Sequence, residues 1–213
     1  MNKLTPHPYK GQFIVLEGGE AVGKTSILEH LTQHYQAQGY DVIRTREPGG
    51  SDFAEKIRHL LFGANNPEYR PLIEAELLLM IAARIDHWHR VIMPALTQGK
   101  MVLCDRYILS TFVYQGFLGG IDKDMIYKIH EQFLPCALPQ KMFLITSSAQ
   151  HIQERLQKRT AENYYDSQDL DKILKLNQAY EDAFSNYQND FNIQKITNDS
   201  SLQEALTSII QAI

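Results

Sequence analysis

The chain has 213 residues, of which 44% are hydrophobic and 22% are charged, and its formal net charge is -4 at pH 7. This composition is typical of one globular domain, and the negative balance argues against a surface devoted to nucleic-acid binding. Its two cysteines do not make a disulfide framework, and no signal-peptide core or apolar run of transmembrane length is found. We therefore expect a cytoplasmic protein that does not enter a membrane.

Residues 1–12 are expected to form an irregular lead-in, followed by a single domain over residues 13–213. Short apolar stretches alternate with longer amphipathic stretches, which indicates alternating strands and helices. The alternation predicts an α/β fold with a five-stranded parallel sheet flanked by helices, and with ligands at the carboxyl ends of the strands. The expected strands are residues 13–16, 41–45, 101–105, 141–146 and 192–196. The expected helices are residues 24–38, 52–61, 72–97, 122–133, 149–159, 170–187 and 201–213.

The first expected strand leads into EGGEAVGKT, in which residues 18–25 fit the pattern G-x-x-x-x-G-K-[ST] of a P-loop. Its glycines allow backbone N–H groups at a helix N-terminus to approach a polyphosphate. Lys24 would contact the β- and γ-phosphates, and Thr25 would give its hydroxyl to Mg²⁺. A glycine-rich turn with a solvent-facing lysine is the alternative, which the strand and helix on either side disfavour. The expected triphosphate-binding residues are Gly18, Gly19, Glu20, Ala21, Val22, Gly23, Lys24, Thr25 and Ser26.

The next elements add charged residues at the same edge of the sheet. The strand at residues 101–105 ends in Asp105, a carboxylate placed to lie near the metal, although an Asp–Arg pair capping the next helix is an alternative. Four arginines map to this mouth, and alone each is more often a surface or salt-bridged residue. Beside a P-loop they favour a second anion, because the guanidinium fork matches phosphate. They are Arg46, Arg58, Arg84 and Arg106.

Pro94 lies inside the long helix expected over residues 72–97. Proline lacks a backbone N–H and clashes with the preceding turn, so a kink or an end is expected there.

The ordered set EGGEAVGKT, TREPGG, AARIDHWHRVIMPAL and DRYILSTFVYQG resembles thymidylate kinases, a family of P-loop nucleoside monophosphate kinases. The likeness runs from about Phe13 to the C-terminus and is strongest through Gln115. It implies a P-loop fold with a small lid, ATP as phosphoryl donor, dTMP as acceptor and Mg²⁺ as cofactor. It also implies a homodimer, formed through helices that include residues 72–97 and 122–133.

The resemblance assigns roles to individual residues. Glu20 would meet the 3′-hydroxyl of dTMP, Arg84 the carbonyl edge of thymine, and Tyr114 would collide with a 2′-hydroxyl. Asp105 would act on the metal side through water. The expected catalytic residues are Lys24, Arg46, Arg106, Arg155 and Arg159. The expected substrate-binding residues are Glu20, Arg46, Arg58, Met80, Arg84, Arg106, Thr111, Tyr114 and Gln115, and the expected metal ligands are Thr25 and Asp105.

The chain departs from the family pattern at three places. Met80 stands where relatives usually carry a phenylalanine stacked on thymine, and its thioether covers a ring less rigidly. Ala21 stands where some relatives place a loop arginine, and members without it usually supply positive charge from a lid. The lid is expected at about residues 153–168, with Arg155 and Arg159 on one helical face. A solvated basic face is the alternative, since AENYYDSQ lacks the family's common Asp-Arg lid pairing.

Three other functions remain as alternatives. A kinase for another nucleoside monophosphate would share the P-loop and the arginines but differ at the base site. A regulatory P-loop GTPase needs a guanine-reading segment such as N-K-x-D, and residues 196–199 are too short a likeness. A non-catalytic nucleotide-binding partner would bind ATP without turnover that depends on a monophosphate.

Overall fold

The protein is described by a computed structural model over residues 4–62, 71–160 and 170–213, with the side chains of residues 159 and 160 left out. In these residues five parallel strands form one sheet in the order β2-β3-β1-β4-β5. The α/β fold with a five-stranded parallel sheet is therefore confirmed, and each strand begins and ends within one residue of its expected bounds. The strands are β1 (Gln12–Glu17), β2 (Val42–Arg46), β3 (Met101–Asp105), β4 (Lys141–Thr146) and β5 (Ile193–Thr197).

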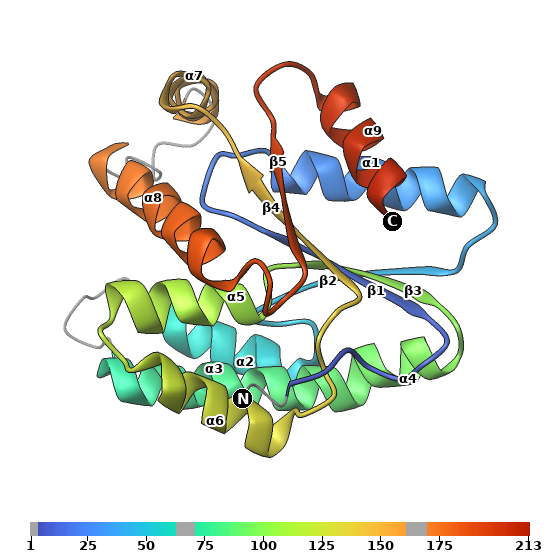
Figure 1. The fold of residues 1–213 in the computed structure, drawn as a ribbon, viewed down its shortest axis with the longest axis vertical. Coiled ribbons are helices and arrows are strands. Elements are labelled where there is room, and N and C mark those ends of the chain that lie inside the picture. The colour runs from blue at the N-terminus through green and yellow to red at the C-terminus, as the bar shows by residue number, and fades with distance from the viewer. Residues whose placement is uncertain (1–3, 63–70, 161–169) are drawn as a thin grey trace.

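Helices cover both faces of the sheet, as Figure 1 shows, with α1 and α9 on one side and α2 to α6 on the other. Each face has its own apolar core, so the two sides of β1 are buried in different clusters. The helices of the described chain are α1 (Lys24–Ala37), α2 (Asp52–Phe62), α3 (Ile73–His87), α4 (Met93–Thr97), α5 (Ile108–Thr111), α6 (Lys123–Phe133), α7 (Ala149–Thr160), α8 (Leu170–Tyr187) and α9 (Leu202–Ala212). None of the helices in the described ranges is long and apolar enough to cross a membrane.

The long helix expected over residues 72–97 does not end at Pro94. A π-helical segment, η2 (Trp88–Ile92), joins α3 to α4, and Pro94 is the second residue of α4. The Met93 N–H donates to the Trp88 carbonyl, five residues back, so the turn before the proline is widened. The chain accommodates the missing proline N–H by changing its hydrogen-bond register, so of the kink or end expected at Pro94 the helix shows a widened turn and no end.

A helical stretch that the sequence did not predict follows β3. It consists of α5 and a π-helical segment, η3 (Phe112–Leu118). The stretch is rich in β-branched and aromatic residues and contains Gly116, which lowers its intrinsic helix propensity. Packing against α3, α6 and α8 therefore decides its conformation.

The register of the sheet brings three strand ends level with one another. Leu16 of β1 and Arg46 of β2 both lie opposite Asp105 of β3. The loops after these strands therefore leave the sheet at the same edge, where parallel sheets bind ligands.

Candidate active site

The P-loop lies between the end of β1 and the start of α1. Gly18 and Gly23 have φ angles of 138° and 93°, in the region that favours glycine. A Cβ on Gly18 would run into the Ile145 carbonyl, and one on Gly23 would run into the Asn198 side chain. Ala21 also has a positive φ, of 58°, although it is not a glycine. Close contacts with β4 and with the turn after β5 thus restrict the backbone conformation of the loop.

Lys24 is buried where the loop enters α1, with 7% of its surface exposed. Its Nζ donates to the carbonyl oxygens of Gly18 at 2.9 Å and Gly19 at 2.7 Å, and lies 4.0 Å from Asp105 Oδ1. Burial and then the positive charge of Arg106 lower the pKa of Lys24 to about 7, against the opposing effect of nearby carboxylates. A polyphosphate beside this ammonium would favour its charged form.

Asp105 and Thr25 offer side-chain oxygen atoms, which are the ligands that a phosphate-bound Mg²⁺ ion prefers. Asp105 Oδ1 is buried and has no hydrogen-bond partner among the described residues, so it can accept from a metal-bound water. Thr25 is exposed in the first turn of α1, directly after Lys24. The described residues contain no group of three or more His, Cys, Asp or Glu that could hold a metal ion alone. Mg²⁺ is usually held by one or two protein groups together with substrate phosphates, which fits this arrangement.

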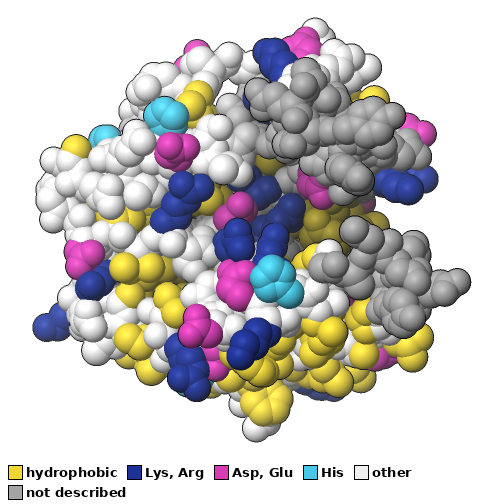
Figure 2. Space-filling view, turned by 180° about the vertical axis from the view of Figure 1, so that it is seen from behind, with side chains coloured by type: hydrophobic (Ala, Val, Ile, Leu, Met, Phe, Trp, Pro, Cys, Tyr) yellow, Lys and Arg dark blue, Asp and Glu magenta, His cyan; other side chains and the backbone are white. Residues whose placement is uncertain are grey.

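Three of the four expected arginines lie near one another at the mouth of the sheet. Arg46 Nη2 donates to Glu55 at 3.1 Å, and Arg58 Nη1 donates to the Pro48 carbonyl at 3.0 Å. Burial lowers the pKa of Arg58, and the positive charges of Arg46 and Arg106 lower it further. Figure 2 shows Lys and Arg side chains gathered, with acidic side chains among them, at the centre of one face. Guanidinium groups this close favour an anion between them.

Arg84 lies in a different environment, inside the protein. Its exposed fraction is 4%, and its Nε donates to Glu47 Oε2 at 2.6 Å. The two Nη atoms contact Thr111 Oγ1 at 2.9 Å, His130 Nε2 at 2.7 Å and the Tyr107 carbonyl at 3.0 Å. Arg84 thus joins α3 to α5, α6 and the end of β2, and its expected contact with thymine remains a prediction.

The histidine partner of Arg84 is a neutral acceptor. His130 Nδ1 lies 2.8 Å from the Ile126 carbonyl, so this nitrogen carries the proton and Nε2 accepts from Arg84. Burial and the positive charge of Arg84 lower the pKa of His130 to about 3. Sequence reasoning missed both His130 and Glu47 as partners. The one indication of them in the sequence was the apolar setting of Arg84. A buried guanidinium needs a polar partner, but the sequence does not identify that partner.

The other expected base-site residues lie on α3 and on the helical stretch after β3. Met80 is half-buried on α3, four residues before Arg84 and so on the same helical face. Gln115 of η3 is buried, and its Nε2 donates to Glu76 Oε1 at 2.7 Å. The structure therefore brings α3 and η3 together with polar groups between them. The expected roles of these residues at a nucleobase remain predictions.

Arg155, expected as a lid residue, contacts the P-loop and the turn after β5. Its Nη1 donates to the Ala21 carbonyl at 3.1 Å and its Nη2 to the Asn198 carbonyl at 2.6 Å. The arginine that reaches the loop at Ala21 thus comes from α7. The side chain of Arg159 and residues 161–168 of the expected lid lie outside the described residues. A cavity of about 400 Å³ lies beside Arg155, between α7, the start of α1 and the turn after β5.

The fold and this site define a P-loop nucleotide-binding protein with a second cluster of basic side chains at the mouth of its sheet. The sequence pattern of the family described as thymidylate kinase matches residues 16–209. This chain belongs to the thymidylate kinase family, and it is an ATP-dependent kinase.

Individual relatives agree with this assignment. The thymidylate kinase of Bartonella quintana is 44% identical over 164 residues, covering 75% of this chain and 76% of the relative. That of Psychrobacter sp. is 42% identical over 175 residues, covering 80% and 82%. The crystal structure of thymidylate kinase from Ehrlichia chaffeensis is 28% identical, with a TM-score of 0.71 over 95% of this chain and 98% of that chain.

Proposed function

We propose that this protein transfers the γ-phosphoryl group of ATP to dTMP, giving ADP and dTDP, a step toward dTTP for DNA synthesis. The observation that carries the proposal is the pair of adjacent basic sites at one edge of the sheet. Lys24 lies in the P-loop, and Arg46, Arg58 and Arg106 cluster beside it. Membership of the thymidylate kinase family supports dTMP as the acceptor.

Phosphoryl transfer between two phosphates needs alignment and neutralisation of charge more than covalent catalysis. Lys24 contacts the β- and γ-phosphates, while Arg46 and Arg106 orient the dTMP phosphate for in-line attack. Thr25 and Asp105 would hold Mg²⁺, which when bound neutralises charge on the β- and γ-phosphates. A phosphate monoester already presents an anionic oxygen near neutral pH, so no general base is needed.

The cavity beside Arg155 suits the nucleoside part of ATP. It is continuous with the start of α1, because Gly23 and Ser26 are among its lining residues. His151, Arg155 and Lys158 from α7 form one wall, and the turn after β5 forms another. Arg155 would add positive charge beside the P-loop at Ala21, and Arg159 would be a second catalytic arginine of the lid.

The acceptor base would lie near the buried network around Arg84. Arg84 and Thr111 are buried and hydrogen-bonded to each other, so they would act on the base as one polar unit. Met80 would cover the thymine ring, and Tyr114 would exclude a ribose 2′-hydroxyl. Glu20, whose negative charge acts on Lys24, would meet the 3′-hydroxyl of the deoxyribose.

A substrate panel tests this function. With ATP and Mg²⁺, ADP release in a coupled assay should be dominated by dTMP over dUMP, dCMP, dGMP, dAMP and UMP. Preference for another monophosphate would still agree with the proposed phosphate-binding residues, but it would contradict the residues assigned to the thymine site. Binding of ATP without turnover of any acceptor would instead favour a nucleotide switch or a non-catalytic partner protein.

Two variants on strand β2 test whether Arg46 binds the acceptor phosphate. Arg46→Ala should raise the KM for dTMP roughly 10- to 100-fold, the effect of losing one charge-assisted hydrogen bond. Arg44→Ala is the matched control, because this exposed arginine lies on the same strand, two residues from the active-site edge. Its kinetic constants should stay close to those of the unaltered protein.

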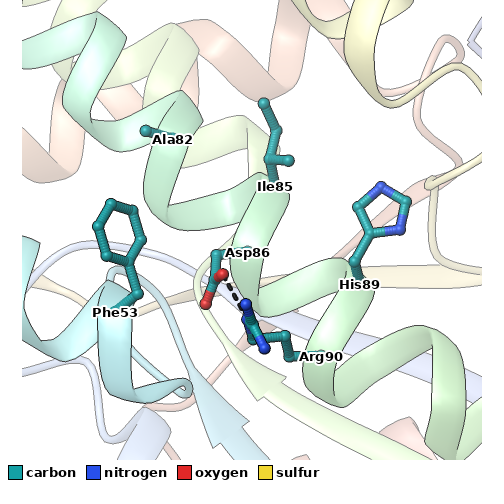
Figure 3. Close-up of a pocket in the computed structure, with 6 residues that line it drawn as sticks. All are labelled: Phe53, Ala82, Ile85, Asp86, His89 and Arg90. Carbon is teal, nitrogen blue, oxygen red and sulfur yellow. Dashed lines mark hydrogen bonds and ion pairs between the residues drawn. The ribbon is translucent and has the colours of Figure 1, made fainter.

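We also propose that two copies of the chain pair through α3, which lies in the stretch 72–97 expected at the interface, and through α2, which was not among the expected helices. A groove of about 560 Å³ lies between these helices, lined by Phe53, Ala82, Ile85, Asp86, His89 and Arg90. Figure 3 shows Phe53 of α2 facing Ala82 and Asp86 across this groove. Half of the surface of Phe53 is exposed, and Leu60 and Leu78 on the same helices are exposed by 63% and 60%. Large apolar side chains exposed together are typical of protein interfaces.

Sedimentation velocity should therefore show a dimer of the unaltered protein. Phe53→Glu should shift it toward the monomer, because a buried interface would not tolerate an unpaired carboxylate. Tyr40→Glu is the control, since Tyr40 is a similarly exposed aromatic residue between α1 and β2. A monomeric unaltered protein, or equal effects of the two changes, would contradict the proposed interface.

A further inference from the structure

Four side chains are hydrogen-bonded in series between the acceptor-side arginine and the base of the P-loop. Arg106 Nη1 donates to the hydroxyl of Tyr180, on α8. The Tyr180 hydroxyl lies 2.7 Å from Ser110 Oγ, and Ser110 Oγ lies 2.7 Å from Glu17 Oε2. Glu17 is the last residue of β1, directly before the loop. Directly bonded partners in the series are up to 93 positions apart in the sequence.

The direction of every hydrogen bond in this series follows from its two ends. A guanidinium group can only donate, and a carboxylate can only accept. Tyr180 therefore accepts from Arg106 and donates to Ser110, and Ser110 donates to Glu17. Each hydroxyl is used once as donor and once as acceptor, an arrangement in which neighbouring hydrogen bonds polarise one another.

The far end of the series is fixed by the fold. Glu17 is fully buried, and its second carboxylate oxygen accepts from the backbone N–H groups of Tyr107 and Ser110, at 2.7 Å and 3.2 Å. Tyr180 is also buried, with 1% of its surface exposed. The carboxylate and the two hydroxyls thus form a rigid support for the guanidinium of Arg106.

Arg106 itself depends on this support. Its backbone has a φ of 67°, and its guanidinium lies 5.6 Å from the ring of Tyr114 and 5.7 Å from the ring of Tyr180. Ring contacts of this kind hold a cation near a surface but leave it free to rotate, whereas a hydrogen bond fixes its plane. The Tyr180 hydroxyl therefore supplies a hydrogen bond that fixes the orientation of the fork, beside the contact with Tyr114.

The same helix also contacts the P-loop. Asn177 lies one turn before Tyr180, and a Cβ on Gly19 would run into its side-chain oxygen. Its Nδ2 donates to the Ile173 carbonyl at 2.9 Å, which turns the amide oxygen toward the loop. One face of α8 therefore touches the donor-side loop through Asn177 and the acceptor-side arginine through Tyr180.

We propose that Tyr180 is a positioning residue for phosphoryl transfer, which orients Arg106 toward the acceptor phosphate through its hydroxyl. The proposal rests on the proposed function, in which Arg106 binds the dTMP phosphate. It assigns to the hydroxyl a role that the tyrosine ring alone does not fulfil. Removing the hydroxyl should therefore affect the acceptor and leave the binding of ATP unchanged.

Tyr180→Phe tests this role, because it keeps the ring and removes only the hydroxyl. We expect kcat/KM for dTMP to fall roughly 10-fold, the effect of losing one hydrogen bond to a charged group, with the KM for ATP unchanged. Tyr187→Phe is the matched control, since this buried tyrosine lies two turns further along α8 and packs against Phe112 and Phe191. The control should keep the kinetic constants of the unaltered protein.

A double variant separates positioning from packing. If Tyr180 acts through Arg106, Tyr180→Phe should have no further effect in an Arg106→Lys background. Should Tyr180→Phe fold poorly, Ser110→Ala interrupts the same series without changing α8 and should reproduce the selective loss with dTMP. An undiminished kcat/KM for dTMP, equal losses with ATP and dTMP, or an effect that persists with Arg106→Lys would overturn the proposal. If the unaltered protein does not use dTMP at all, the proposed function itself fails, which the substrate panel reveals independently.

Discussion

Replacing Lys24 by alanine is expected to lower kcat by roughly 100- to 1000-fold, the usual loss when one preorganised charge at the reacting group is removed. Lys24 is buried among the loop carbonyls, and its Nζ lies 4.0 Å from the carboxylate of Asp105. Charge on the transferred phosphoryl group would develop in this same space, where water does not screen it. Steady-state turnover with saturating ATP, Mg²⁺ and dTMP measures the loss.

Two comparisons control this experiment. Lys10→Ala removes an exposed lysine before the start of β1, at the end of that strand away from the loop, and should leave turnover unchanged. In the unaltered protein, kcat/KM for ATP should fall as the pH rises through about 7, because it reports the free enzyme, in which the Lys24 ammonium then loses its proton. Lys24→Arg keeps the charge and should lack this fall, whatever its absolute rate. Unchanged turnover of Lys24→Ala would remove Lys24 from catalysis.

Replacing Arg84 by alanine is expected to reduce the free energy of unfolding by roughly 3–5 kcal/mol, because it leaves a buried carboxylate without its main partner. Arg84 and Glu47 are exposed by only 4% and 5%, and their ion pair spans 2.6 Å. The change also removes hydrogen bonds to Thr111, His130 and the Tyr107 carbonyl. For a chain of this length the loss corresponds to a fall in Tm of roughly 6–20 °C, measured by thermal and urea unfolding.

An exposed ion pair supplies the control. Lys195 and Glu181 are 3.1 Å apart, with side-chain exposures of 42% and 33%. Lys195→Ala should cost less than about 1 kcal/mol, because solvent screens exposed pairs. A similarly small effect of Arg84→Ala would contradict the structural role of Arg84. If the folded variant retains activity, a larger loss with dTMP than with dCMP would support its role at thymine, and equal losses would argue against it.

The amino-acid sequence alone was enough to predict the fold and the P-loop, because both depend on local patterns. Apolar stretches separated by amphipathic ones gave the bounds of the strands and of most helices. The P-loop can be recognised from consecutive residues, because its glycines and Lys24 bind the same ligand from one short loop. The arginines at the strand ends followed from the rule that parallel strands end at one edge.

Only the tertiary structure decided which side chains meet. Arg84 was recognisable as a buried cation, but its partners Glu47 and His130 are 37 and 46 positions away. Nothing in the sequence singled out Tyr180, because its proposed role depends on a hydrogen bond with Arg106, 74 positions earlier. The helix after β3 was missed for the same reason, since its first N–H groups are capped by Glu17 from another strand. Local patterns specify the conformation of a segment, whereas contacts between distant segments depend on the register of the sheet and the packing of helices on it, which no short stretch of sequence contains.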